Sequence, residues 1–533
     1  MTSVILTMLF LLAVLVLVAV GAQRFKLPPS ILLVIAGVIL ALIPGLPAIE
    51  LAPELVLLVL LPPLIYSAGV SMSWREFCFN LRPITLLAFG CVIFTTAAVA
   101  TAMHYLLGWP WSVAFVLGAI VSPPDVVAPL AIARRLHLPR RILVVLEGEG
   151  LANDATALIL YRFAVLAVTA GSFSFPQAAG TFALIVVGEV LYGIGVGWLS
   201  LRLRHWAHNP RVEITLSLMT PFLAYWVPHQ LGGSGVLATI AAGLYVSWNG
   251  PRLISAATRL QGIFFWDLVI YLIEGFVFLI TGLQARTLIE KAHDFPVGQI
   301  LEATAIAAVI VIGARFVWVF PATYGSRLIP AVRRRDPSPP WRWTFVIAFV
   351  GVRGVVSLAA ALAIPLWTDS GSPFPYRDLI LFATFGVIIV TLVGQGLLLP
   401  TVIHWLGLHS DGKADARNER QSELDARNEA MHAARQRLDL MAKERGLGDD
   451  VVAFLSARHD HRERLIPSDL DEGLEQMRTS NDVRLELIAA ERDFLYGMLR
   501  SGRITDESRR RLERDLDLEE AAILSRREGE MPL

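Results

Sequence analysis

The sequence predicts an all-α integral membrane protein with about 13 transmembrane helices and a helical cytoplasmic C-terminal region. Hydrophobic residues make up 55% of the 533 residues and charged residues only 17%, whereas a soluble globular protein has about 25% charged residues. Charge is also unevenly distributed, and long apolar segments alternate with short basic loops. These observations exclude a soluble enzyme and a nucleic-acid-binding protein. Two cysteines also exclude a disulfide scaffold.

Charge divides the chain into two predicted domains. Residues 1–410 hold 24 Lys and Arg against 17 Asp and Glu, and residues 411–533 hold 22 against 29. We expect residues 1–410 to be the transmembrane domain and residues 411–533 a cytoplasmic regulatory or interaction region. Near-heptad apolar spacing predicts helices in the second domain. Its run Arg458–His461 has metal-ligand types, although a solvated polar stretch is the favoured interpretation.

The apolar segments define the spans, because a helix needs about 20 mostly apolar residues to cross a bilayer. The first segment lacks the basic start of a signal peptide. Its apolar run is also longer than the apolar region of a typical signal peptide, so we expect it to remain in the protein as an uncleaved helix. The predicted spans are residues 4–22, 31–46, 55–72, 84–107, 112–133, 142–170, 178–203, 212–229, 233–249, 263–287, 298–326, 343–367 and 379–406.

The loops predict the orientation. Loops after odd-numbered spans are rich in arginine, as in residues 134–141, and loops after even-numbered spans, such as residues 44–50, 171–176, 290–294 and 368–378, are poor in it. Cytoplasmic loops collect Lys and Arg. The alternation therefore predicts a multi-pass inner-membrane protein whose N-terminus is outside and whose C-terminal region is cytoplasmic. The basic surplus needs no nucleic-acid partner.

Ionisable groups inside spans usually mark an ion or proton path, because burying them in a bilayer is unfavourable. Asp125 lies in the fifth span, directly after Ser122, Pro123 and Pro124. Adjacent prolines interrupt a helix, and a broken helix beside a carboxylate is one way in which transporters build a cation site. A simple proline kink with Asp125 as a helix cap is the structural alternative, and the two are compatible.

The sixth span holds Glu147, Glu149 and Asp154, with Asn153 one turn after Glu149. These acids cannot all be charged in an apolar setting without a bound proton or a positive partner. A carboxylate that alternately binds H⁺ and a cation would couple the two fluxes. For Glu149 we favour a buried structural ion pair.

The basic partners are expected in the eleventh and twelfth spans. Arg315 is surrounded by apolar residues, and Arg353 lies between Gly351 and Gly354, which permit a second helix break. Spans one to six and eight to thirteen would place the two breaks at equivalent positions of inverted repeats. Glu274 is a further buried acid. Additional ionisable or polar candidates are Glu189, Glu302, Arg162, Asp267 and Gln395.

These three motifs in this order resemble those of the bacterial sodium/proton antiporters of the monovalent cation/proton antiporter superfamily, which includes the sodium/proton exchangers. The likeness covers about residues 1 to 406 and leaves the C-terminal region uncovered. It implies a homodimer and a core in which two broken helices cross. It also implies electroneutral exchange of one Na⁺, or Li⁺ or K⁺, for one H⁺ in pH homeostasis, without a cofactor.

By motif position, the resemblance implies that Asp154 binds the cation or the proton. Asn153 would support the site, and Asp125 would lie near the crossing as a further cation- or proton-binding residue. Glu149 would pair with Arg315, and Arg353 would neutralise the crossing region.

The sequence departs from the family pattern at three places. A triplet such as Thr-Asp-Pro is replaced by Pro124-Asp125-Val126, a serine is replaced by Gly150, and an acid after a Pro-Pro pair is replaced by Ser67. Ser67 and Ser122 are therefore further candidates for the site. Fewer protein oxygens leave Na⁺ and K⁺ both open.

Three other interpretations compete. The first is a K⁺-selective antiporter or a cation channel gated by the C-terminal region, although the sequence has no channel filter motif. An intramembrane enzyme is disfavoured because the zinc-protease and serine-hydrolase motifs are lacking. A sensor would act through the C-terminal region and a small-molecule or protein regulator. Substitution of Asp154 would abolish antiport and leave a sensor function intact.

Overall fold

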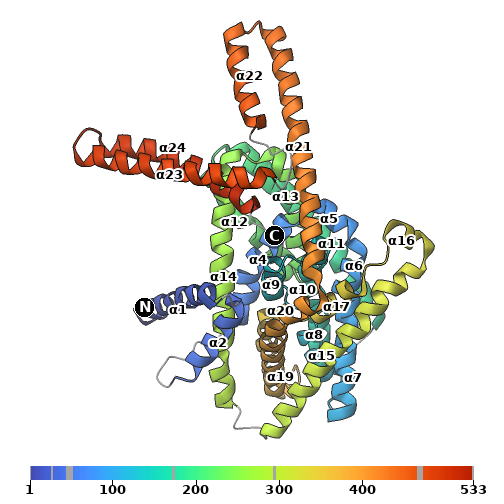
Figure 1. Cartoon of the computed structure of the whole chain (residues 1–533). Coiled ribbons are helices and arrows are strands. Elements are labelled where there is room, and N and C mark those ends of the chain that lie inside the picture. The colour runs from blue at the N-terminus through green and yellow to red at the C-terminus, as the bar shows by residue number, and fades with distance from the viewer. Residues whose placement is uncertain are drawn as a thin grey trace. The chain divides into compact units, whose positions relative to one another are not determined.

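A computed structural model of the whole chain describes residues 2–25, 28–43, 52–170, 175–291, 296–464 and 472–530. These residues are helical apart from their loops, and an isolated bridge between Trp367 and Pro373 is the only strand-like pairing among them. The chain forms two compact units, Met1–His409 and Ser410–Leu533 (Figure 1). The predicted loop 44–50 and parts of the loops 171–176 and 290–294 lie outside the described residues.

The first unit contains the helices of the predicted spans. Its α-helices are α1 (Thr2–Phe25), α2 (Pro29–Ala41), α3 (Pro53–Leu55), α4 (Leu61–Ser71), α5 (Trp74–Phe79), α6 (Leu81–Thr85), α7 (Val92–Leu107), α8 (Trp111–Val121), α9 (Val127–Arg135), α10 (Arg140–Thr169), α11 (Phe175–Ala207), α12 (Pro210–Gln230), α13 (Val236–Leu253), α14 (Ala256–Lys291), α15 (Val297–Gly325), α16 (Pro330–Arg335), α17 (Trp341–Phe349), α18 (Val355–Leu362), α19 (Arg377–Ile389) and α20 (Gly396–Leu406). Short π-helical or 3₁₀ segments join some of them: η1 (Val56–Leu60), η2 (Leu86–Cys91), η4 (Ser326–Leu328) and η5 (Val390–Gln395).

Eight continuous helical stretches of the described chain are long and apolar enough to cross a membrane. They are Leu6–Arg24, Pro53–Ser71, Leu81–Leu107, Arg140–Thr169, Gly180–Ala207, Ala256–Glu290, Val297–Leu328 and Arg377–Leu406. The other predicted spans have a different form. Residues 31–46 correspond to the 13-residue α2, residues 212–229 and 233–249 to α12 and α13, and residues 112–133 and 343–367 are each split into two helices.

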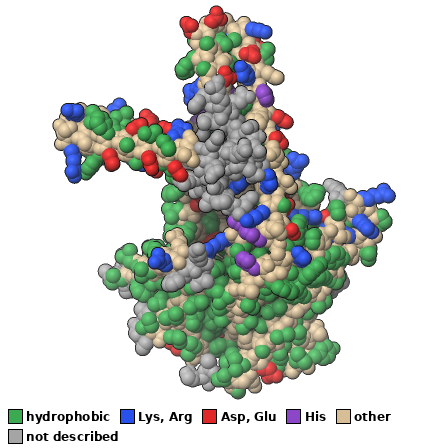
Figure 2. Space-filling model, viewed as in Figure 1, with side chains coloured by type: hydrophobic (Ala, Val, Ile, Leu, Met, Phe, Trp, Pro, Cys, Tyr) green, Lys and Arg blue, Asp and Glu red, His purple; other side chains and the backbone are tan. Residues whose placement is uncertain are grey.

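Small residues allow these helices to pack with their backbones in contact. A Cβ on Gly37 of α2 would lie 2.3 Å from the carbonyl oxygen of Leu279 on α14, and one on Gly193 of α11 would lie 2.1 Å from that of Ala238 on α13. Such close approach is typical of helix pairs in membranes, where small residues line the contact. Hydrophobic side chains cover much of the first unit's surface in the view of Figure 2.

A buried carboxylate joins α11 to the start of α13. Glu189 is 4% exposed. It accepts hydrogen bonds from the backbone N–H groups of Ser234 at 2.5 Å, Gly235 at 2.9 Å and Leu237 at 3.1 Å. The first N–H groups of a helix have no partner within the helix, and a negative charge there is favourable. Glu189, a candidate from the sequence, therefore caps α13.

The second unit is a set of exposed helices held by ion pairs. It comprises most of α21 (Leu408–Arg445), with α22 (Asp449–Arg464), α23 (Glu472–Arg500) and α24 (Asp506–Glu530). Arg484 on α23 pairs with Glu519 on α24 at 2.5 Å, and Arg435 pairs with Asp460 at 2.9 Å. Within the described residues no group of three His, Cys, Asp or Glu side chains could hold a metal ion.

We predict that Glu189→Ala lowers the free energy of unfolding by about 2 kcal/mol or more, because several buried N–H groups lose a charged acceptor. Thermal unfolding of the purified protein in detergent, followed by tryptophan fluorescence, measures the effect. Glu302→Ala removes an exposed acid and should leave the unfolding midpoint within one degree or so. Equal midpoints for the two variants would contradict the capping role.

Candidate functional site

The fifth predicted span is interrupted at its middle. Residues 122–126 separate α8 from α9. Pro123 and Pro124 lack backbone N–H groups and cannot continue the helix. The carboxylate of Asp125 accepts a hydrogen bond from the backbone N–H of Val127 at 3.0 Å. Asp125 thus caps the first turn of α9, which is the structural role considered for it from the sequence.

The twelfth predicted span has a second interruption, and the two interruptions touch. Residues 350–354 separate α17 from α18. The backbone N–H of Asp125 donates to the carbonyl of Val352 at 2.7 Å. A Cβ on Gly354 would lie 2.5 Å from the Oδ2 atom of Asp125. Glycine is therefore required at position 354 for the two interruptions to approach each other.

α10 places two candidates beside this contact. Asn153 is fully buried, and its Nδ2 donates to the carbonyl of Pro124 at 2.6 Å. Its Oδ1 accepts from the backbone N–H of Asp154 at 2.7 Å. Asp154 is half-buried, and its carboxylate has no hydrogen bond or ion pair with any residue that the structure describes. A carboxylate in this state is open to a proton or a cation.

Glu149 and Arg315 form a buried ion pair. Arg315 donates from Nη1 to Oε1 of Glu149 and from Nη2 to Oε2 at 2.8 Å. The two side chains are 0% and 1% exposed. Arg315 also donates from Nε and Nη2 to the carbonyl of Ile347, at 3.1 and 2.9 Å. A Cβ on Gly351 would lie 2.9 Å from Cδ of Arg315, so this glycine leaves room for the arginine.

The charge of Arg353 lies within the second interruption. Its side chain is 1% exposed, and its Nε and Nη1 have no hydrogen-bond partner among the described residues. Its backbone N–H donates to Oγ1 of Thr391 at 2.9 Å. Gln395, one turn after Thr391, donates to the carbonyl of Phe349 at 3.2 Å. Side chains of η5 thus form hydrogen bonds with backbone groups that the interruption leaves without helical partners.

Two departures from the family pattern fit each other. A Cβ on Gly150 would lie 2.2 Å from Cγ2 of Val126. The valine that follows Asp125 therefore occupies the space that a side chain at position 150 would need. A methyl group of Val126 therefore lies where a serine at position 150 would place its side chain.

The remaining candidates are dispersed. Ser122 is buried and donates to the carbonyl of Ala119 at 3.1 Å, so its hydroxyl is committed to its own helix. Ser67 on α4 and Glu274 on α14 are half-buried, and Asp267 and Glu302 are exposed. Arg162 bonds Nδ1 of His229 at 2.9 Å.

A cavity of about 220 Å³ lies further along α10 than Asp154. Leu158 and Arg162, one and two turns after Asp154, line it together with Tyr161, Tyr225 and His229. Arg162 is a candidate from the sequence, whereas His229 and Thr391 are not. Thr391 could have been found from its position one turn before Gln395 in an apolar span. Polar groups in a span usually have a specific partner, so a hydroxyl and an amide on one face indicate a contact with another polar element.

We predict that Gly150→Ser destabilises the protein by about 1 to 3 kcal/mol through overpacking, and that Val126→Ala restores much of the loss. Gly313→Ser is a matched control, because nothing lies within 4 Å of a Cβ built at Gly313. Thermal unfolding of Gly150→Ser, of the double variant Gly150→Ser with Val126→Ala, and of Gly313→Ser measures the effect. Equal loss in Gly150→Ser and in the double variant would contradict the proposed contact.

Removing Arg315 should be costly, because Glu149 would remain as an unpaired buried charge. We predict that Arg315→Gln lowers stability by about 3 to 5 kcal/mol. Arg427→Gln breaks an exposed pair with Glu423 and should change stability by less than about 1 kcal/mol. Denaturant or thermal unfolding compares them, and a wild-type midpoint for Arg315→Gln would refute the importance of the pair.

Comparison with known proteins identifies the family. Residues 10–405 match the family described as sodium/hydrogen exchanger, transmembrane. An uncharacterised Na⁺/H⁺ exchanger of Mycobacterium bovis is 36% identical, over 98% of this chain and 96% of the relative. A sodium, potassium, lithium and rubidium/H⁺ antiporter of Bacillus pumilus is 32% identical, over 85% of this chain and 69% of the relative.

The fold agrees with a solved structure. The sodium/proton antiporter MjNhaP1 of Methanocaldococcus jannaschii superposes with a TM-score of 0.60 and 19% identity, covering 76% of this chain and 99% of that protein. Sequence and fold therefore lead to the same assignment: the chain belongs to the sodium/hydrogen exchanger family, among the bacterial sodium/proton antiporters of the membrane.

Proposed function

We propose that this protein exchanges one monovalent cation for one proton by alternating access, and that Asp154 carries either ion. The observation that carries the proposal is the state of Asp154. It lies beside the two meeting helix interruptions, half-buried, and its carboxylate has no partner among the described residues. The nearby Asn153 and Asp125 are committed to backbone groups, and Glu149 is committed to an ion pair.

Electroneutrality follows from a single carrier carboxylate. Asp154 with a bound proton and Asp154 with a bound monovalent cation have the same net charge, so one carrier moves no net charge over a full cycle. Asn153 is neutral and holds the interruption through the carbonyl of Pro124. Asp125 caps α9 and lies next to the same carbonyls, and unwound carbonyls with a carboxylate are a cation-binding arrangement.

Each supporting residue has a distinct proposed role. The pair of Glu149 and Arg315 fixes α10 against α15 and the end of α17. The unpartnered guanidinium of Arg353 balances the carbonyl ends and carboxylates near the interruptions. Glu274, Ser67 and Ser122 are proposed as secondary groups, with water supplying the remaining ligands.

The cation selectivity is proposed to be broad. Gly150 and Val126 bring no oxygen to the site, and a site with fewer protein oxygens discriminates less by ligand geometry. The relative from Bacillus pumilus is named for sodium, potassium, lithium and rubidium. We propose Na⁺ as the main substrate, with Li⁺ or K⁺ also accepted.

The wider architecture is proposed from the sequence and the family. Thirteen spans in two inverted repeats would put the N-terminus outside and the second unit in the cytoplasm, where it would regulate transport. A homodimer surrounded by lipid is the proposed assembly. A cation channel gated by the C-terminal region is the alternative function, and it would conduct a current without exchanging protons.

The experiment is ion exchange in liposomes. With a proton gradient and an internal pH-sensitive dye, adding Na⁺, Li⁺ or K⁺ should collapse the gradient in the wild type, and clamping the membrane potential should not change the rate. Asp154→Asn should lower the rate by about 100-fold or more, because a neutral amide neither takes up a proton nor offers a negative charge to a cation. Asp369→Asn, which changes an exposed loop carboxylate, should retain the wild-type rate.

Persistent exchange in Asp154→Asn would refute the carrier role. A cation flux that depends on the clamp and moves no protons would support the channel instead.

A further inference from the structure

Three arginines from separate parts of the first unit converge on one carboxylate. Asp336 accepts hydrogen bonds from Arg141 at 2.6 Å on Oδ1, and from Arg82 at 2.5 Å and Arg327 at 2.8 Å on Oδ2. Arg327 also donates to the carbonyl of Asp336 at 3.2 Å. One carboxylate neutralises one of three guanidinium groups, so the cluster keeps a formal charge of about +2.

The surrounding arginines favour the ionised form of the Asp336 carboxylate. Burial raises the pKa of Asp336, but the hydrogen bonds and charges of Arg141 and Arg327 outweigh burial and hold the pKa below its usual value. Because the three guanidinium groups also stay charged at neutral pH, the cluster keeps its excess positive charge there.

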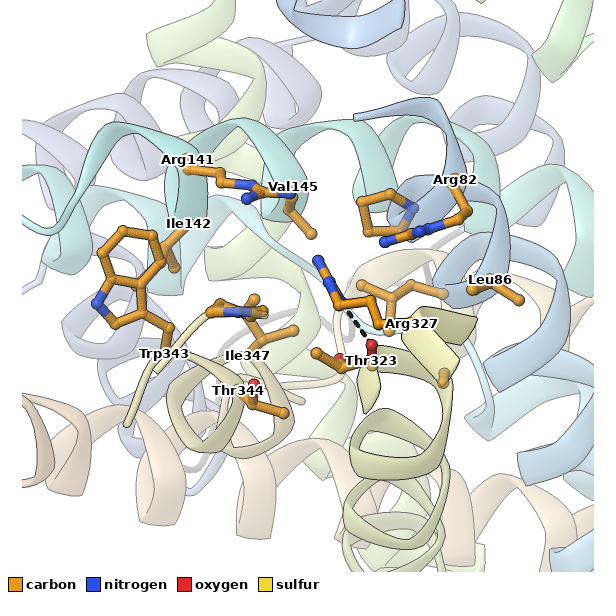
Figure 3. Close-up of a pocket in the computed structure, with 14 residues that line it drawn as sticks. Arg82, Leu86, Arg141, Ile142, Val145, Thr323, Arg327, Trp343, Thr344 and Ile347 are labelled. Carbon is orange, nitrogen blue, oxygen red and sulfur yellow. Dashed lines mark hydrogen bonds between the residues drawn. The ribbon is translucent and has the colours of Figure 1, made fainter. Parts of the chain in front are cut away.

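A pocket of about 40 Å³ opens beside the arginines. Figure 3 shows Arg82 and Arg141 on one side of it and Trp343 and Ile347 on the opposite side, with Arg327 between them. The described residues that line the pocket include no Asp or Glu. Nε of Arg82 is buried without a hydrogen-bond partner among the described residues. The pocket thus combines excess positive charge and one unpartnered N–H group with an apolar wall.

All three arginines lie near the ends of helical stretches that are long and apolar enough to cross a membrane. Arg82 is the second residue of the apolar stretch Leu81–Leu107, Arg141 the second of Arg140–Thr169, and Arg327 the last but one of Val297–Leu328. The ends of membrane-crossing helices lie where lipid headgroups meet the hydrocarbon core. The apolar wall continues towards the acyl chains through Leu86 and Val145.

We propose that this pocket binds the phosphate of an anionic phospholipid, with the guanidinium groups of Arg82 and Arg141 on the phosphate oxygens and the lipid's apolar part along Trp343 and Ile347. Guanidinium groups recognise phosphate by paired, charge-assisted hydrogen bonds. Basic pockets between membrane helices are known sites for anionic headgroups. A dissolved phosphate would satisfy the arginines but would leave the apolar wall uncovered, so the structure favours the lipid.

The full-length protein in detergent tests this by native mass spectrometry with phosphatidylglycerol and phosphatidylcholine. We expect the wild type to bind phosphatidylglycerol about 10-fold more tightly than phosphatidylcholine. Arg82→Gln with Arg141→Gln should abolish that preference. Arg140→Gln removes a neighbouring charge that pairs with Glu76 and does not line the pocket, and it should keep the preference within about two-fold.

Asp336→Asn gives an independent test, since it removes the competing carboxylate and leaves every arginine in place. It should bind phosphatidylglycerol several-fold more tightly than the wild type, and it decides the question if the double variant does not fold. Unchanged or weaker binding in Asp336→Asn, or an equal loss of preference in Arg140→Gln and the double variant, would overturn the proposal. Inorganic phosphate that displaces phosphatidylglycerol at equal concentration would overturn the lipid assignment in favour of dissolved phosphate.

Discussion

The contact between two interrupted helices determines the rest of the core. Each interruption frees backbone N–H and carbonyl groups in an apolar interior, where an unsatisfied group costs several kcal/mol. One pair of these groups satisfies each other, through the N–H of Asp125 and the carbonyl of Val352. Side chains satisfy others: Asn153 at Pro124, Arg315 at Ile347, Gln395 at Phe349 and Thr391 at Arg353.

This requirement leaves one carboxylate uncommitted beside the interruptions. Asn153 and Arg315 serve carbonyls, and Glu149 is held by Arg315. Asp154 alone among the neighbouring acids of α10 has a carboxylate without a described partner and some access to solvent. The same contacts that stabilise the broken helices therefore separate the proposed carrier from the residues that support it.

The sequence predicted the chemistry of the core better than its contacts. Adjacent prolines, paired glycines and charges within apolar spans are local signals, and they located both interruptions and Arg315. The cap formed by Glu189 and the fit of Val126 to Gly150 depend on which helices pack together, so neither could be predicted from a single sequence. The cluster around Asp336 was missed because its members look like ordinary loop charges until the fold brings them together.

In the proposed transport cycle, one carboxylate binds either the proton or the cation. The most direct test is the apparent KM for Na⁺ across a range of external pH in liposomes, with the rate measured at saturating Na⁺. Competition for a single site predicts that KM rises up to about 10-fold per unit as pH falls, while the saturated rate is unchanged. A KM independent of pH, with only the saturated rate changing, would show that the two ions bind at separate groups and would contradict a shared carboxylate.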